Sequence, residues 1–172
     1  MRKILSTGAV FYGLAALAVA VDQVSKRVIF DCQTDSLEVT LLPGVFLRLI
    51  STGNPGVVWG LLGSWPQMVF LGGILAAALV ILYFHKYGHK SRWETAALGL
   101  ILGGAGGNLI DRATIGHVRD FLDVRIANYH WPTFNAADAF ITVGAGILIG
   151  FFIFAGGESG PKTGASSQKT AP

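Results

Sequence analysis

The sequence predicts an all-α membrane bundle of four transmembrane helices that carries a small extracytoplasmic β-sheet and loop. More than half of the 172 residues are hydrophobic and only 13% are charged, whereas about a quarter of a typical soluble domain is charged. Four apolar segments come close to the roughly 20 residues that an α-helix needs to cross a bilayer. Alternating apolar and polar residues between the first two segments predict short strands.

The four apolar segments cover approximately residues 4–29, 68–84, 93–110 and 136–155. The first could instead be a cleaved signal peptide, because Arg2 and Lys3 resemble an n-region and Ala18-Val19-Ala20 resembles a cleavage site. We favour a retained helix, since the apolar stretch is longer than a typical h-region and three further spans follow it.

The loop between the second and third segments fixes the predicted orientation. Residues 86–92 carry three Lys or Arg side chains and no acid, and short basic loops stay in the cytoplasm. An even number of spans then places both termini in the cytoplasm. Seven of the 13 Lys and Arg residues fall inside and six outside, whereas two of the ten acids fall inside and eight outside.

With this orientation, residues 1–155 form one membrane-embedded domain with an extracytoplasmic insertion at about 31–67. A second external loop covers about 111–135. Residues 37–41 and 45–50 alternate as strands do, and Pro43-Gly44 between them predicts a turn. The tail, residues 156–172, is rich in Gly, Ser, Lys and Thr and is predicted to be disordered in the cytoplasm.

Small residues in the third and fourth segments predict close helix packing. Gly99, Gly103 and Gly107 are spaced by four, as are Gly146 and Gly150, and such spacing lets helices approach each other in lipid. This packing would bring the outer ends of the two segments together.

Composition argues against several classes of function. The sequence contains no basic run with interleaved aromatic residues, so nucleic-acid binding is not predicted. The single cysteine, Cys32, cannot form an internal disulfide. His85 and His89 are four residues apart but lie in the basic loop, so neither a metal nor another cofactor is predicted.

Polar residues collect at the predicted outer end of the bundle, where charge near a span is costly and often functional. Each group also has a structural explanation: an intrahelical ion pair, an interfacial anchor or a helix N-cap. These explanations weaken when all the groups lie at one depth. The groups are Asp22 with Lys26, Asn108 with Asp111 and Arg112, and Asn135 with Asp138.

Asp120 and Asp138 are the candidate catalytic pair, with Asp22 and Asp111 as competing candidates from the residues alone. Asp120 lies in the external loop, 18 residues before Asp138, so the loop can fold back. Two close carboxylates do not both ionise easily, so one keeps a proton while the other acts as a base. Asp138, in a first helical turn, would be the more readily ionised partner.

Four blocks of this sequence resemble bacterial lipoprotein signal peptidases (signal peptidase II), over about residues 5–155. The blocks occur in the order found in the family. They are Asp22-Gln23-Val24-Ser25-Lys26, Gly106-Gly107-Asn108-Leu109-Ile110-Asp111-Arg112, Val118-Arg119-Asp120-Phe121 and Phe134-Asn135-Ala136-Ala137-Asp138.

The resemblance implies an aspartyl endopeptidase of the bacterial inner membrane, with its active site at the periplasmic face. Its substrates would be diacylglyceryl-modified prolipoproteins, cleaved just before the lipidated cysteine, and the cyclic peptide globomycin would inhibit it. Asp120 and Asp138 match the catalytic pair. The positions that match supporting or substrate-contacting residues are Asp22, Lys26, Asn54, Asn108, Asp111, Arg112 and Asn135.

The sequence departs from the family at one string. After the strands the family has an Asn-x-Gly-x-x-Phe-Ser-like pattern, in which Asn54 and Gly56 fit but Trp59 and Gly60 replace Phe and Ser. Contacts with substrate or inhibitor are therefore expected to differ in detail there.

Three other functions compete. A transporter or proton relay would spread its acids through the bilayer, but the second segment has no charge. A scaffold held by glycine faces would not depend on its acids. A protease with mid-helix aspartates would not place Asp120 in a loop.

Overall fold

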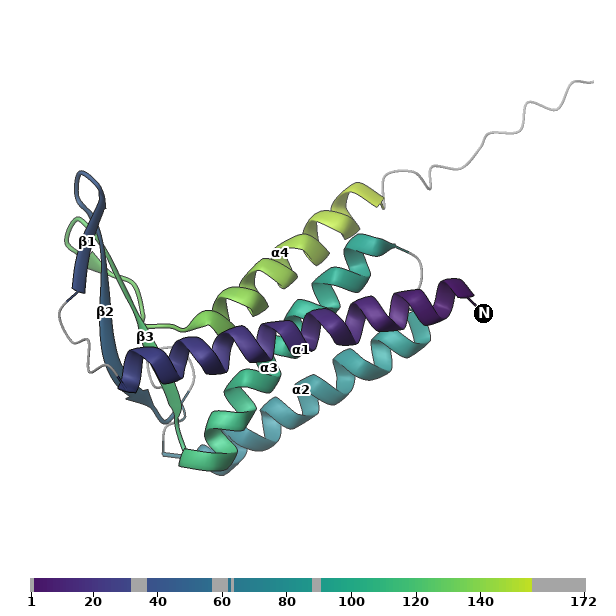
Figure 1. The fold of residues 1–172 in the computed structure, drawn as a ribbon, viewed down its shortest axis with the longest axis horizontal. Coiled ribbons are helices and arrows are strands. Elements are labelled where there is room, and N and C mark those ends of the chain that lie inside the picture. The colour runs from purple at the N-terminus through teal and green to yellow at the C-terminus, as the bar shows by residue number, and fades with distance from the viewer. Residues whose placement is uncertain (1, 32–36, 57–61, 63, 88–90, 156–172) are drawn as a thin grey trace, which may run out of the picture.

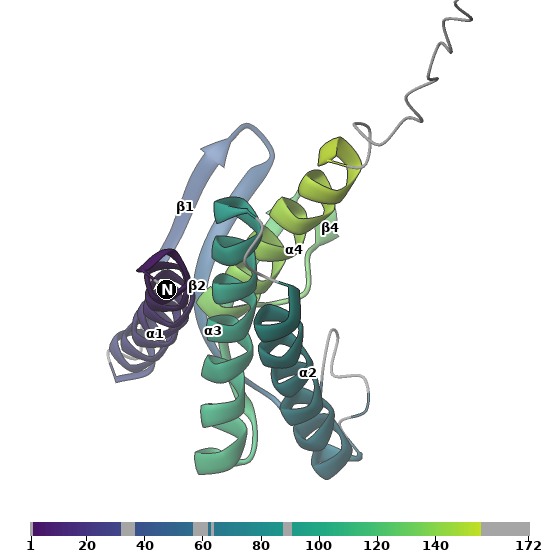
Figure 2. The same ribbon diagram turned by 90° about the vertical axis from the view of Figure 1, so that its right-hand side faces the viewer.

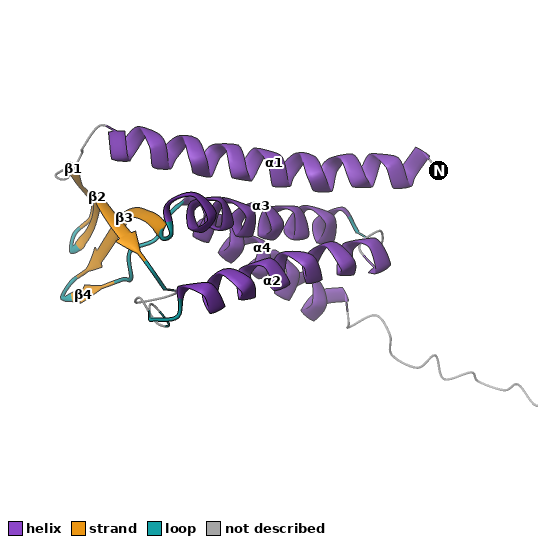
Figure 3. Cartoon of the chain, turned by 90° about the horizontal axis from the view of Figure 1, so that it is seen from below, coloured by secondary structure: helices purple, strands orange, loops and turns teal. Residues whose placement is uncertain are grey.

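The computed structural model describes residues 2–31, 37–56, 62, 64–87 and 91–155. Within these residues four helices lie alongside one another and a β-sheet lies at one end of them (Figures 1 and 3). The elements are α1 (Arg2–Asp31), β1 (Leu37–Leu42), β2 (Val45–Asn54), α2 (Pro66–Tyr87), α3 (Arg92–Ile115), β3 (Val118–Ile126), β4 (Tyr129–His130) and α4 (Ala136–Ala155).

Three of the described helices contain segments long and apolar enough to cross a membrane: Thr7–Asp31, Pro66–Tyr87 and Ala136–Phe154. α3 is not among them, although the sequence predicted a span there. Its glycines, together with Asn108, Asp111 and Arg112, make it less apolar. α3 lies between the other helices (Figure 2), and ten of its residues are buried, so protein rather than lipid covers much of its surface.

Gly99, Gly103 and Gly107 of α3 allow close helix packing, but they face α1 and not the fourth segment that the sequence predicted. A side chain at Gly99 would meet the backbone of Phe11, and one at Gly103 would meet the backbone of Ala15. One turn further on, Gly107 faces the carboxylate of Asp22, which would occupy the space of an added Cβ. The predicted glycine face therefore brings α1 and its polar residues against the end of α3.

The predicted packing role of Gly146 and Gly150 is wrong. A Cβ added at either position meets nothing within 4 Å. α4 instead contacts α3 through Gly144, which faces the backbone of Ala97, and Gly104 of α3 faces the backbone of Ala137. Gly144 and Gly146 are two residues apart and point to different sides of a helix with 3.6 residues per turn, so only one of them can face α3.

An aromatic cluster joins the helices at the end away from the sheet. The rings of Phe11 and Phe84 stack with centroids 3.8 Å apart, and buried Leu98 completes the cluster. Beside it, Tyr12 and His85 form a hydrogen bond of 2.9 Å. The cluster connects α1, α2 and α3, far from the outer polar residues.

The sheet is antiparallel, with strand order β1-β2-β3-β4. The two predicted strands are present, and Gly44 between them has the positive φ of 78° that suits its turn. Sequence reasoning missed β3, and the prediction that Asp120 lies in a loop is wrong. Asp120 lies in β3, opposite Thr52 of β2. Residues 118–124 do not alternate regularly between apolar and polar, so this strand depends on its pairing with the long β2 strand.

Replacing Gly103 with alanine should destabilise the bundle. The new Cβ would lie 2.6 Å from the Ala15 carbonyl oxygen and 2.6 Å from the Ala18 Cβ, and backbone atoms cannot move away freely. We expect a loss of about 1–3 kcal/mol in the free energy of unfolding, measured by denaturation in detergent. Gly146→Ala, which meets nothing, should be neutral or stabilising by up to about 1 kcal/mol. Equal losses in both variants would contradict this account.

Candidate active site

Asp120 and Asp138 are brought together by one residue, Asn135. The Asn135 side-chain nitrogen donates to Asp120 Oδ1 at 2.7 Å, and the Asn135 backbone nitrogen donates to Asp138 Oδ2 at 3.1 Å. The two carboxylates therefore share a partner, although one lies on a strand and the other on a helix. Asp120 is almost fully buried, at 1% exposure, whereas Asp138 is partly exposed.

The start of α4 explains why Asn135 and Asp138 have fixed positions. Asn135 Oδ1 accepts a hydrogen bond of 3.1 Å from the Asp138 backbone nitrogen, while Asp138 caps the Asn135 nitrogen in return. This reciprocal pair is a capping box with Asp in the third helical position. The predicted N-cap is present, and it also holds the Asp138 carboxylate at the end of the helix.

Two more asparagines hold the outer oxygens of the pair. Asn54 Nδ2 donates to Asp120 Oδ2 at 3.0 Å, because Asn54 lies diagonally across from Asp120 in the β2–β3 pairing. Asn108 Nδ2 donates to Asp138 Oδ1 at 2.8 Å. All four carboxylate oxygens therefore accept hydrogen bonds from neutral amide groups.

The pKa of Asp120 is raised to about 6, chiefly by burial and also by the nearby charge of Asp138, while the bonds from Asn54 and Asn135 and the charge of Lys26 act in the opposite direction. Desolvation dominates because a buried carboxylate loses its hydration and amide donors replace only part of it. Near neutral pH, Asp120 therefore lies close to the point at which it gains or loses a proton.

A buried lysine neutralises the acids behind the pair. Lys26 is fully buried, and its Nζ lies 2.8 Å from Asp22 Oδ2 and 3.2 Å from Asp111 Oδ2. The same Nζ donates to Asn108 Oδ1 at 3.1 Å. Lys26 thus joins α1 to α3 and orients the asparagine that contacts Asp138.

Asp22 and Asp111 hold the backbones next to the two candidate catalytic acids. Asp22 Oδ1 accepts a 2.9 Å hydrogen bond from the backbone nitrogen of Ala137, the neighbour of Asp138. Asp111 Oδ2 accepts a 3.0 Å bond from the backbone nitrogen of Arg119, the neighbour of Asp120. Asp22 and Asp111 competed as catalytic candidates from sequence alone. In the structure each binds the backbone nitrogen of the residue just before a member of the pair.

Residues 14–154 match the family described as signal peptidase (SPase) II. The chain belongs to the signal peptidase II family. A lipoprotein signal peptidase from Sulfurihydrogenibium sp. (strain YO3AOP1) is 37% identical over 159 residues, which cover 89% of this chain and 94% of the relative. One from Burkholderia mallei (strain SAVP1) is 40% identical over 141 residues, covering 80% and 83%.

Solved structures agree with this membership. A bacterial membrane enzyme determined by the in meso method at 2.3 Å resolution has a TM-score of 0.73 and 28% identity, covering 92% of each chain. A second, determined at 1.9 Å, has a TM-score of 0.68 and 32% identity, covering 79% of this chain and 87% of that one. Together with the apolar helices, these similarities identify a membrane-embedded peptidase.

Sequence reasoning passed over two residues of this signal peptidase II site. Gln23 Nε2 donates to Asp111 Oδ1 at 3.1 Å, and Gln23 Oε1 accepts from Arg119 at 3.0 Å. Arg119 also binds Asp111 Oδ1 at 2.7 Å. Both residues lie inside the family blocks, directly beside Asp22 and Asp120, and that adjacency was the signal available in the sequence.

Arg112 ties α3 to the segment that follows β2. Its Nη2 donates to the Gly56 carbonyl oxygen at 2.8 Å, which holds the strand end that carries Asn54. The divergent positions Trp59 and Gly60 lie outside the described residues, as does Cys32. Among the residues that the structure describes, no three His, Cys, Asp or Glu side chains are grouped so that they could hold a metal ion.

Replacing Lys26 with methionine should strongly destabilise this signal peptidase. Asp22 and Asp111 would stay buried without their shared lysine, and breaking a buried pair costs about 3–5 kcal/mol. Arg27→Gln is the matched control, because Arg27 pairs with Asp31 at 3.6 Å where both side chains are largely exposed. The control should lose less than about 1 kcal/mol. Denaturation of both variants in detergent measures the difference in the free energy of unfolding. A loss in Lys26→Met as small as that in Arg27→Gln would show that Lys26 is dispensable for stability.

Proposed function

We propose that this chain is an aspartyl endopeptidase that removes the signal peptide from diacylglyceryl-modified prolipoproteins by cleaving before the lipidated cysteine. Its relatives are named lipoprotein signal peptidases. The observation that carries the proposal is the sharing of Asn135 between Asp120 and Asp138. That arrangement supplies a paired acid and base and needs no cofactor.

In the proposed reaction, Asp138 is the base and Asp120 is the acid. Asp138 is partly exposed, so water can reach its carboxylate. It also lies at the positive end of the α4 dipole, which favours the ionised form that a base needs. Asp120 acts in its protonated form, which is well populated only near or below its raised pKa of about 6. Asp138 takes a proton from water as the water oxygen bonds to the scissile carbonyl carbon, and Asp120 donates its proton to the carbonyl oxygen.

The second half of the reaction reverses these roles. Asp138 passes its new proton to the leaving amine as the carbon–nitrogen bond breaks. Asp120 takes back a proton from the hydroxyl group of the tetrahedral intermediate as the carbonyl forms again. The pair thus returns to its starting state, and the two groups titrate as a coupled unit.

The proposed membrane arrangement has four spans, including α3. α3 has 24 residues, or about 36 Å at 1.5 Å per residue, which exceeds the roughly 30 Å hydrocarbon core. Its neighbours α1 and α4 run alongside it (Figure 1). Because other helices surround α3, it needs less apolar surface than a helix that faces lipid.

With four spans, residues 1–155 form one domain of the bacterial inner membrane, with both termini and residues 156–172 in the cytoplasm. The sheet and the Asp120–Asp138 pair face the periplasm, where diacylglyceryl prolipoproteins present their cleavage site. Globomycin is expected to inhibit by occupying this end of the bundle. The proposed supporting or substrate-contacting groups are Asp22, Lys26, Asn54, Asn108, Asp111, Arg112 and Asn135.

Asp120→Asn and Asp138→Asn should each lower the rate of cleavage of a purified diacylglyceryl prolipoprotein by at least about 100-fold, because each removes a general acid or base. Asp123→Asn is the control, since Asp123 lies on the same strand but pairs with Arg48 at 3.0 Å. It should retain near wild-type activity. Wild-type rates in both Asp120 and Asp138 variants would show that the pair is not catalytic.

The rate should also depend on pH. Because Asp120 must be protonated to act as an acid and its pKa is about 6, kcat/KM should fall as the pH rises above about 6, approaching tenfold per pH unit. Measuring kcat/KM between pH 5 and 8.5 tests this. The Asp123→Asn control should show the same profile. A flat profile over this range would contradict the assignment of Asp120 as the acid.

A further inference from the structure

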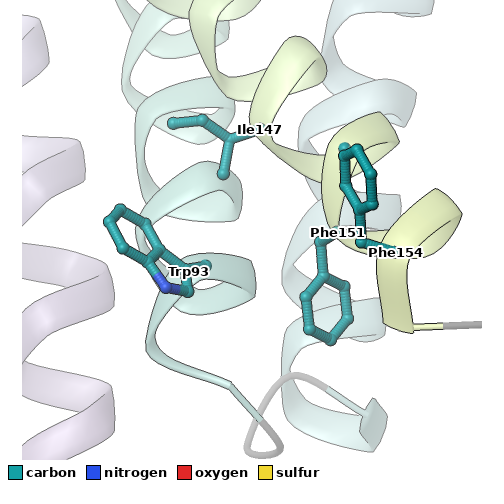
Figure 4. A pocket seen from close by; sticks show the side chains of 5 residues that line it. Trp93, Ile147, Phe151 and Phe154 are labelled. Carbon is teal, nitrogen blue, oxygen red and sulfur yellow. The ribbon is translucent and has the colours of Figure 1, made fainter. Parts of the chain in front are cut away.

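An apolar groove lies between α3 and α4 at the end of the bundle opposite the Asp120–Asp138 pair. It encloses about 290 Å³ and almost no polar surface. Figure 4 shows the side chain of Trp93 on α3 and those of Ile147 and Phe151 on α4 at the border of the groove. The residues that line it are Trp93, Ile147, Gly150, Phe151 and Phe154.

The groove faces the bilayer rather than the protein interior. Trp93 is 58% exposed and Phe154 is 82% exposed. Trp93 is the second residue of α3, a position that matches the aromatic belt of membrane interfaces. Phe151 follows Asp138 by 13 residues of one helix, or about 20 Å. The groove is therefore separate from the candidate catalytic pair and lies in the other half of the membrane.

Positive charge borders the mouth of the groove. The exposed Arg92 guanidinium lies over the Trp93 ring, 5.4 Å from its centroid. Lys86 lies over the ring of Tyr87 at the same end of the bundle, at 5.1 Å, but neither residue lines the groove. The nearby acid, Glu94, is buried and accepts a hydrogen bond from Tyr83 at 3.0 Å, so its charge faces α2 instead of the groove.

We propose that this groove is a binding site for an anionic phospholipid of the cytoplasmic leaflet. One acyl chain fills the groove between Trp93 and Phe151, and the phosphate pairs with Arg92. Basic residues beside helices on the cytoplasmic side are a recognised means of binding anionic headgroups. The proposal goes beyond the peptidase activity and relies only on the membrane orientation proposed above.

Charge distinguishes this occupant from a substrate. A signal peptide also offers an apolar helix, but its n-region is positively charged, and Arg92 would repel it. A zwitterionic lipid could fill the groove with a chain but would gain little from Arg92. The combination of an apolar groove with an exposed arginine at its mouth therefore favours a lipid that carries net negative charge.

Native mass spectrometry of the full chain in detergent tests the proposal by measuring the Kd of palmitoyl-oleoyl phosphatidylglycerol and of phosphatidylcholine with the same chains. Wild type should bind phosphatidylglycerol about fivefold more tightly, the gain expected for one basic residue near the headgroup. Arg92→Gln should remove this preference and leave phosphatidylcholine binding unchanged. Gly150→Leu should weaken the binding of both lipids at least threefold, since Gly150 lines the groove and a Cβ added there meets nothing within 4 Å, so the new side chain can occupy the groove.

Two matched controls separate the groove from general effects. Lys86→Gln removes a positive charge at the same end, and Gly72→Leu adds the same side chain on α2, where an added Cβ also meets nothing within 4 Å. Both should bind like wild type. Equal affinity of wild type for the two lipids would overturn the proposal, as would unchanged lipid binding in Gly150→Leu. If Gly150→Leu converts a dimer into a monomer without changing lipid binding, the groove is instead an interface between two copies. Should Gly150→Leu fail to fold, Arg92→Gln decides alone.

Discussion

The structure depends on the neutralisation of buried charge around Lys26. A lysine with no exposed surface is tolerated in a membrane bundle only where acids surround it, and here Asp22 and Asp111 do so from two different helices. Asp22 also accepts a hydrogen bond from the backbone nitrogen of Ala137, next to Asp138. Asp111 accepts one from the backbone nitrogen of Arg119, next to Asp120. The charge cluster therefore fixes α1, α3, β3 and the start of α4 relative to one another.

This arrangement requires close helix approach as well as charge. Gly107 leaves the space that the Asp22 carboxylate occupies, and Gly104 lets the first turn of α4 lie against α3. A larger residue at either place would move the helices apart and lengthen the hydrogen bonds of the cluster. Packing and electrostatics are thus coupled at this end of the bundle, because the polar contacts exist only at the separation that glycine permits.

The two ends of the bundle have different chemistry. At the sheet end, neutral amide donors from Asn54, Asn108 and Asn135 orient two carboxylates without neutralising them. Amide groups leave the pair free to exchange a proton, whereas arginine in the same place would hold both acids ionised. At the other end, the rings of Phe11 and Phe84 stack in the buried core, and an apolar groove faces the lipid. The fold therefore separates the proposed catalytic pair from the proposed lipid site by most of the membrane thickness.

Sequence alone determined the apolar segments, the first two strands and the collection of polar residues at one end. These features follow from local composition and from periodicity, which the chain carries whatever its tertiary structure. Sequence did not identify β3, because a strand that contains Asp120, Asp123 and two arginines is stabilised by pairing with β2 rather than by its own apolar residues. It also assigned packing to Gly146 and Gly150, since spacing identifies a face but not its partner.

Only the tertiary structure decided which acids lie beside which. Asp22, Asp111, Asp120 and Asp138 share one end of the bundle and are similar as residues. Two of the acids bind Lys26 and the main chain, and two share Asn135. Although the Asp22–Lys26 and Asn135–Asp138 contacts are local, the bonds from Asn135 to Asp120 and from Ala137 to Asp22 join residues 15 and 115 positions apart. Such long-range contacts depend on helix separation and strand register, which no local pattern encodes.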